Sequence, residues 1–180
     1  RLSALSTALP LVILGIGRTI TMEIWWLGHS CVRIRSSDTT LITDPYGDAL
    51  GLSIGPQSAE VITVSHLHPH HSQSQVVGGA PRVVSGPGEY EIGDFYITGM
   101  GTRRRPEDKD INTVYYMQAE DLTLCHLGDL NATLSSRQVD ALRATDIMFA
   151  PVGGVCTLDT QQIVELVNLI APKIVVPIHF

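Results

Sequence analysis

Four of the seven histidines in this 180-residue chain lie between His66 and His71. They directly follow Val61–Ser65, an apolar and β-branched run that predicts a strand, and loops that leave strand ends often carry functional sites. His66 and His68 are two residues apart, so in an extended segment both imidazoles project to one side and can reach the same ion. Imidazole nitrogen suits Zn²⁺, and catalytic zinc sites combine three protein ligands with water. The cluster therefore predicts a zinc site.

The alternative interpretation of this cluster is a solvated polar loop, or histidines that serve only as hydrogen-bonding groups. A single histidine would favour that interpretation. Four histidines within six residues, directly after a buried strand, favour metal binding instead.

Short β-rich runs bounded by Gly, Pro, Asp or Ser predict the elements that position this loop. Strands are expected at Glu23–Leu27, Cys31–Arg35, Thr40–Thr43, Val61–Ser65, Arg82–Ser85, Phe95–Thr98, Thr113–Met117 and Leu122–His126. The last two flank a polar turn and predict a hairpin.

Two helices are predicted by capping-box patterns, at Ser135–Gln138 and at Asp159–Gln162. The second precedes apolar residues at helical spacing, and Pro172 ends it. Each helix is followed by an apolar run, Asp146–Pro151 or Lys173–Ile178. Strands followed by strand–helix repeats predict an α/β (α+β) fold in which helices cover sheets.

Composition bounds the remaining possibilities. With 44% apolar residues, 180 residues can bury one sizeable core, so residues 22–180 are expected to form one domain and residues 1–21 an upstream extension. The apolar stretch 8–16 is too short to span a bilayer. A net charge of −6 without a basic stripe argues against a nucleic-acid partner. Three dispersed cysteines fit a reducing cytoplasm. A homo-oligomer is compatible with the sequence.

The histidine loop resembles the His-x-His-x-Asp-His signature of the metallo-β-lactamase superfamily. Six further segments, in the order of that family, look like landmarks of its UlaG-like branch: Trp26–Ser30, Leu41–Pro45, Gly86–Tyr90, His126–Asp129, Pro151–Gly154 and Pro172–His179. The resemblance implies a four-layer αββα sandwich with metal at one edge, between the two sheets.

Carried over residue by residue, the resemblance implies that His66 and His68 bind a first metal, that His71 and His179 bind a second, and that Asp129 bridges them. His70 stands where the signature has an Asp that ligates the second metal and orients the attacking water. Histidine can coordinate zinc, so His70 is retained as a ligand and, with Asp129, as a catalytic candidate.

A second departure from the family pattern lies at Arg104, where the branch usually has a histidine ligand. Arginine stays protonated and cannot bind a metal, so we expect one zinc or fewer per chain, with manganese or iron as other candidates. His29 and His126 are candidates for the missing ligand, although hydrogen bonds to other ligands are the favoured role. Cys31 and Cys125 are expected to be buried apolar residues.

The arginines Arg103, Arg104 and Arg105 allow two interpretations. They could bind the anionic group of a substrate, or they could form a solvated loop with the acidic residues Glu107 and Asp108.

Zinc lowers the pKa of bound water from about 15.7 toward 7, so hydrolysis of a small, anionic molecule is the expected reaction. A relative that has lost catalysis and acts as a binding protein, with or without metal, is the alternative, because His70 and Arg104 depart from the pattern. A nuclease of the same fold is disfavoured by the acidic charge.

Overall fold

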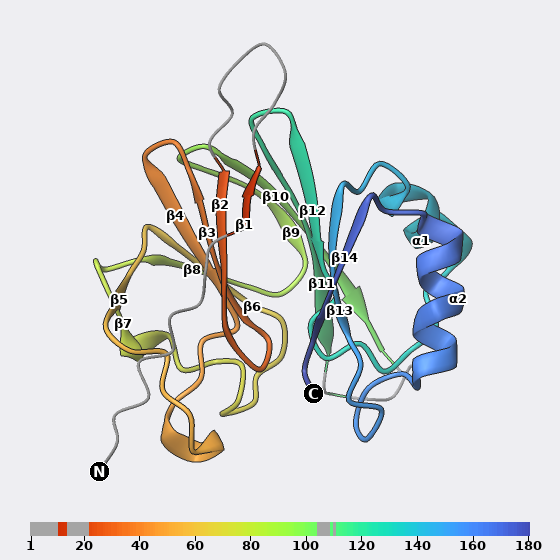
Figure 1. Cartoon of the computed structure of the whole chain (residues 1–180), viewed down its shortest axis with the longest axis horizontal. Helices are drawn as coiled ribbons and strands as arrows, with labels where there is room; N and C mark the ends of the chain where they lie inside the picture. The colour runs from red at the N-terminus through yellow and green to blue at the C-terminus, as the bar shows by residue number, and fades with distance from the viewer. Residues whose placement is uncertain (1–10, 14–21, 104–108, 110) are drawn as a thin grey trace.

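In the computed structural model, the described residues (11–13, 22–103, 109 and 111–180) form two six-stranded sheets packed face to face (Figure 1). The first sheet has the order β1-β2-β3-β4-β6-β8, built from Leu11–Ile13, Met22–Gly28, Cys31–Ser36, Thr39–Thr43, Val61–Val64 and Arg82–Ser85. The second has the order β14-β13-β12-β11-β10-β9, built from Ile174–Ile178, Ile147–Pro151, Leu122–His126, Asn112–Ala119, Phe95–Thr102 and Gly88–Ile92.

The main core lies between the two sheets. Strands of both sheets contribute apolar side chains to one buried cluster, including Ile34, Leu41, Phe95, Tyr115 and Phe149. Burial of this inward-facing surface is the largest favourable term that holds the sheets together.

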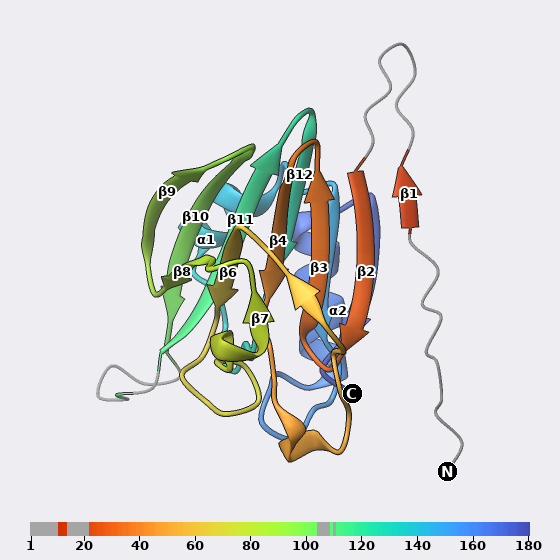
Figure 2. The same ribbon diagram turned by 90° about the vertical axis from the view of Figure 1, so that its left-hand side faces the viewer.

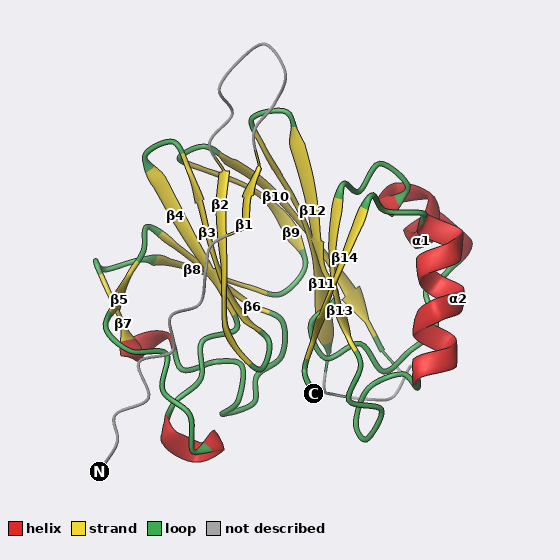
Figure 3. Ribbon diagram, viewed as in Figure 1, coloured by secondary structure: helices red, strands yellow, loops and turns green. Residues whose placement is uncertain are grey.

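Helices α1 (Ser136–Leu142) and α2 (Thr160–Ile170) cover the outer face of the second sheet (Figure 3). Both begin with the predicted capping box: Ser135 pairs with Gln138, and Asp159 pairs with Gln162. Ile163, Leu166 and Ile170 of α2 pack into a second apolar cluster against the sheet.

The outer face of the first sheet is covered differently. The short paired strands β5 (Gln57–Ser58) and β7 (Val77–Gly78) and the 3-10 turn Ser74–Val76 lie over it, and a second 3-10 turn, Asp48–Leu50, lies below them at the lower edge (Figure 2). They enclose a third apolar cluster around Tyr46. The predicted sandwich is therefore confirmed, although within the described ranges no α-helix forms its fourth layer.

Every predicted strand is present, with bounds shifted by a few residues. The largest extension is β10, which continues to Thr102 instead of ending at Thr98. Strands β1, β5, β7 and β9 were not predicted. Strand β1 comes from the segment expected to be an upstream extension, and it pairs antiparallel with β2. The part of the chain that the structure describes contains no helix long and apolar enough to cross a membrane.

Strand direction brings the chemistry to one edge of the sandwich. Strands β4, β6 and β8 run parallel in the first sheet, and β12, β13 and β14 run parallel in the second. The carboxyl ends of these strands and the turn between β2 and β3 lie at the lower edge in Figure 1. The loops that leave this edge carry the candidate ligands.

Candidate metal centre

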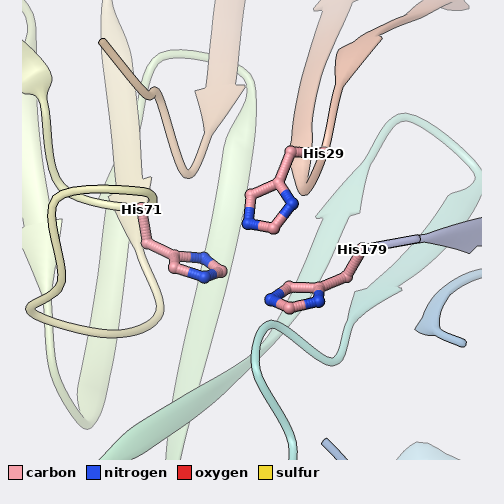
Figure 4. A group of neighbouring side chains, drawn as sticks. All are labelled: His29, His71 and His179. Atoms are coloured by element: carbon pink, nitrogen blue, oxygen red, sulfur yellow. The ribbon is translucent and has the colours of Figure 1, made fainter. Parts of the chain in front are cut away.

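Six potential metal donors converge at this edge, in three groups of three. The groups are His29, His71 and His179; His66, His71 and Asp129; and Asp129, Cys156 and His179. Within each group, one donor atom from each residue lies within 4.8 Å of the others. His71, Asp129 and His179 each belong to two groups, so they link the three groups into one site. Figure 4 shows His29, His71 and His179 directed toward one another.

His71 is oriented by a buried carboxylate. Its Nδ1 lies 2.9 Å from Oδ2 of Asp44, which is fully buried at the end of β4 and also accepts hydrogen bonds from the backbone and hydroxyl of Ser65. Burial alone would raise the pKa of Asp44, but the bonds from His71 and Ser65 hold it below its usual value. Because a carboxylate only accepts, His71 carries its proton on Nδ1 and keeps the Nε2 lone pair for a metal.

Asp129 is held by a close approach of three backbone segments. Its backbone nitrogen donates to Oδ1 of Asn112 at 2.8 Å, and the Asn112 amide donates in turn to Leu127. The preceding Gly128 has φ +62°, and a Cβ there would lie 2.4 Å from Cβ of Ser65. Only glycine fits this position without displacement, so the approach to Ser65 fixes where the carboxylate points.

The Asp129 side chain lies between histidines. Its two oxygens lie 3.4 Å from Nδ1 of His66 and 3.4 Å from Nε2 of His179, and Oδ1 is buried without a hydrogen-bond partner among the described residues. Burial would raise its pKa, but the hydrogen bond from His66 and the charge of His179 lower it below the usual value. Asp129 is therefore an anionic donor, and its Oδ1 makes no hydrogen bond among the described residues.

His29 and His179 lie at the tips of the two sheets and contact each other. The backbone nitrogen of His179 donates to the carbonyl of His29 at 3.1 Å, and their rings lie 4.1 Å apart. Both residues have left-handed backbones, with φ 50° and 57°. Such conformations occur at functional sites when the surroundings enforce them. Here stacking of Trp26 on Phe180 flanks the contact.

His29 is poised as a neutral donor. Burial, and then the nearby His179 and His71, lower its pKa to about 4. Its Nε2 is buried and has no hydrogen-bond partner among the described residues. A neutral imidazole with a free lone pair is the form that binds metal.

His68 and His70 lie outside the three groups. His68 is exposed, and its ring is 5.9 Å from that of His66. His70 is half-buried, its ring lies 5.9 Å from that of His29, and its backbone nitrogen donates to Nδ1 of His68. Their roles as ligands, and that of His70 in catalysis, stay predictions.

The remaining predicted residues fall into two sets. His126 is fully buried, and its Nε2 bonds the carbonyl of Ser30 next to His29, an arrangement compatible with the favoured supporting role. Arg103 is exposed, whereas Arg104 and Arg105 lie outside the described residues.

Sequence reasoning missed Asp44, Asn112 and Cys156 as site residues. Asp44 had a usable signal, since it is an acidic residue directly after a buried strand. Cys156 had none, because it lies in a loop far along the chain from its neighbours Asp129 and His179.

The donor set fits a divalent metal ion. It combines neutral imidazoles, a carboxylate whose Oδ1 makes no hydrogen bond among the described residues, and a second residue, Asp44, that fixes the orientation of one ligand. Oriented nitrogen and oxygen donors of this kind are typical of zinc and of other transition metals.

The lowered histidine pKa values predict acid sensitivity of the metal-free protein. Burial lowers the pKa of both His29 and His126 below 6.5, the value of a histidine in the unfolded chain. As the pH falls below 6.5, the unfolded chain therefore takes up protons before the folded protein does. The contribution of these two histidines to stability is present above about pH 6.5 and is lost as the pH falls toward 4. In urea denaturation with a chelator present, we expect the midpoint to fall between about pH 7 and pH 5, and less so for His126→Gln. A midpoint that stays constant over this range would contradict the expectation.

Comparison with known proteins supplies independent findings. Residues 23–179 match the family model of the β-lactamase superfamily domain. A UPF0173 protein of Pyrococcus furiosus is 27% identical, over 88% of this chain and 83% of its own. A UPF0173 metal-dependent hydrolase of Lysinibacillus sphaericus is 24% identical, over 88% of this chain and 85% of its own.

Among solved structures, one from Thermotoga maritima superposes with a TM-score of 0.76 and 31% identity. It covers 88% of this chain and 76% of its own, and it is assigned as a candidate zinc-dependent hydrolase of the metallo-β-lactamase superfamily.

Proposed function

Because this chain belongs to the metallo-β-lactamase superfamily, we propose that it is a metal-dependent hydrolase that uses zinc at the edge between its two sheets. The observation that carries the proposal is the convergence of three donor groups, which His71, Asp129 and His179 link because each belongs to two of them. Relatives whose names describe metal-dependent hydrolases support the reaction class.

The ligands that we propose come from the linking residues His71, Asp129 and His179, and His29 and His66 on their flanks are the alternatives that complete a set of three protein ligands. His71 and Asp129 are positioned by Asp44 and Asn112, so the donors are oriented before a metal arrives. Preorganised donors of this kind raise affinity, because little side-chain entropy is lost on binding.

We propose about one tightly bound zinc per chain. A neutral imidazole donates one lone pair to one ion, so groups that share His71 or His179 compete for it. Two ions could share only Asp129, and close ions repel strongly unless anionic ligands offset the repulsion.

In the reaction, bound zinc supplies a polarising charge and lowers the pKa of water. The chain supplies the remaining functions. The Asp129 carboxylate, whose Oδ1 makes no hydrogen bond among the described residues, can hold the proton that leaves the attacking water. Burial lowers the pKa of both His29 and His179, which favours the neutral imidazole that can donate to a metal.

Two cavities beside the ligands favour a small substrate. One of about 210 Å³ opens next to His66 and has Lys109 on its lining, and one of about 260 Å³ lies next to His29 and His179. The ammonium of Lys109 favours an anionic group, such as a carboxylate or a phosphate, in the first cavity.

The test combines metal analysis with a substrate screen. We expect the protein purified with zinc to hold about one ion and to hydrolyse some esters, lactones or phosphodiesters, and His71→Ala and His179→Ala to lose both properties. His68→Ala distinguishes two ligand sets, since it retains zinc if the three groups hold the ion and loses zinc if the family carry-over is right. Unchanged zinc content in both His71→Ala and His179→Ala would refute the site. Zinc binding without turnover on any substrate class would favour the binding-protein alternative.

A further inference from the structure

The third donor group contains a cysteine that the family signature does not include. Cys156 lies in the loop Val152–Leu158 between β13 and α2, and its sulfur lies within 4.8 Å of donor atoms of Asp129 and His179. The same side chain lines the cavity of about 260 Å³ with His29 and His179. Cys156 therefore faces the site.

Two backbone hydrogen bonds hold this loop against the chain segments that carry its partners. Val152 donates to the carbonyl of Ile178, the residue before His179, at 3.0 Å. Leu158 donates at 2.8 Å to the carbonyl of Leu130, the residue after Asp129. The position of Cys156 relative to Asp129 and His179 is thus built into the fold at both ends of the loop.

The loop also approaches His179 closely. A Cβ on Gly153 would lie 2.3 Å from the carbonyl oxygen of His179, so only glycine permits this packing without displacement. Within the loop, the backbone of Gly154 donates to the hydroxyl of Thr157, which closes the turn around Cys156. These contacts keep the thiol beside the ligands although it is exposed to solvent.

Asp129 provides an independent sign that a cation binds between these residues. Its residue surface is 8% exposed, and Oδ1 is buried without a hydrogen-bond partner among the described residues. Its nearest ionic neighbour is Nε2 of His179 at 3.4 Å, and a buried carboxylate oxygen without a hydrogen bond is costly unless a cation or donor satisfies it. It lies within reach of both His179 and Cys156.

We propose that Cys156 is a thiolate ligand of the metal bound between Asp129 and His179. This inference rests on the proposed metal site. On binding, the sulfur forms a bond to the metal and its proton passes to solvent, so the oxidation states do not change. Asp129 and Cys156 then contribute two negative charges that balance a divalent ion. The thiolate thereby supplies the second anion that the signature position at His70 lacks.

Cobalt substitution tests the proposal directly. Metal-free protein is titrated with Co²⁺, and the absorption spectrum is recorded for the wild type and for Cys156→Ser. We expect visible ligand-field bands in both proteins, and an intense near-ultraviolet sulfur-to-cobalt charge-transfer band only in the wild type. Cys31 and Cys125 are fully buried in two apolar clusters and belong to no donor group. Both remain in Cys156→Ser, so any sulfur-to-cobalt band that they produced would persist in that variant.

A second readout does not depend on spectroscopy. Burial and the Asp129 carboxylate raise the pKa of Cys156, so the reaction is run at alkaline pH, where we expect iodoacetamide to modify this exposed thiol in the metal-free protein and bound zinc to slow the modification about tenfold. Ligand-field bands without a charge-transfer band, together with unchanged alkylation, would overturn the thiolate ligand and leave the hydrolase proposal intact. Absence of all cobalt bands in the wild type would overturn both.

Discussion

Replacing Asp44 with Asn will destabilise the protein by about 3 kcal/mol and weaken zinc binding by about 10- to 100-fold. Asp44 is fully buried and accepts hydrogen bonds from Ser65 and His71. Asn keeps the shape but loses the charge, and its amide group directs hydrogen atoms toward donors. The one acceptor oxygen of Asn cannot serve both the Ser65 backbone and His71, so the acceptor that fixes the His71 proton on Nδ1 is weakened or lost.

Two measurements separate the effects of this substitution. Urea denaturation with a chelator gives the free energy of unfolding, and competition with a chromogenic chelator gives the zinc affinity. Asp48→Asn is the matched control, since Asp48 is exposed in a 3-10 turn. Wild-type zinc affinity in Asp44→Asn would show that Asp44 stabilises the fold without orienting a ligand.

Replacing Gly128 with Ala will have the second large effect. The left-handed backbone costs an alanine about 1 kcal/mol, and the added Cβ would lie 2.4 Å from Ser65 and 2.6 Å from Oδ1 of Asn112. Relief of such overpacking costs a further 1–3 kcal/mol or so. Because Asn112 holds the backbone of Asp129, relaxation moves the carboxylate, and we expect zinc binding to fall as well.

Gly55→Ala is the control for this substitution. Gly55 has φ +66° but no atom within 4 Å of an added Cβ, so its substitution measures the cost of the left-handed backbone alone. We expect a loss of about 1 kcal/mol at Gly55 and about 3 kcal/mol at Gly128 by urea denaturation. Equal losses would mean that the close approach to Ser65 relaxes without cost.

The sequence predicted those elements whose local chemistry is complete. Helix α2 carries its capping box, an apolar stripe and a following proline within one segment, so its start at Thr160 could be predicted from the sequence. Strand β9 was not, because Gly88–Ile92 alternates charged and apolar residues at the edge of the sheet and forms only by pairing with β10. The formation of β9 therefore depends on its pairing partner and not on its own sequence pattern.

The same difference between local patterns and tertiary contacts explains why only part of the candidate site was predicted. The histidine cluster and Asp129 have recognisable local patterns, whereas His29 gained its place only because the turn between β2 and β3 meets the end of β14. Asn112 acts on Asp129 through a contact between β11 and the loop after β12. No spacing within the sequence encodes such a contact, and periodicity does not reveal it.

The hydrogen bond between His179 and His29 bears on the order in which the chain folds. It joins the turn after β2 to the residue after β14, so it forms only when both sheets have been assembled. Contacts between residues so distant in sequence form late, because the entropy of loop closure is lost before they contribute. A chain emerging from the ribosome therefore exposes its histidine-rich loop well before His179 exists to complete the site. We therefore expect that the candidate metal centre is complete only in the finished domain.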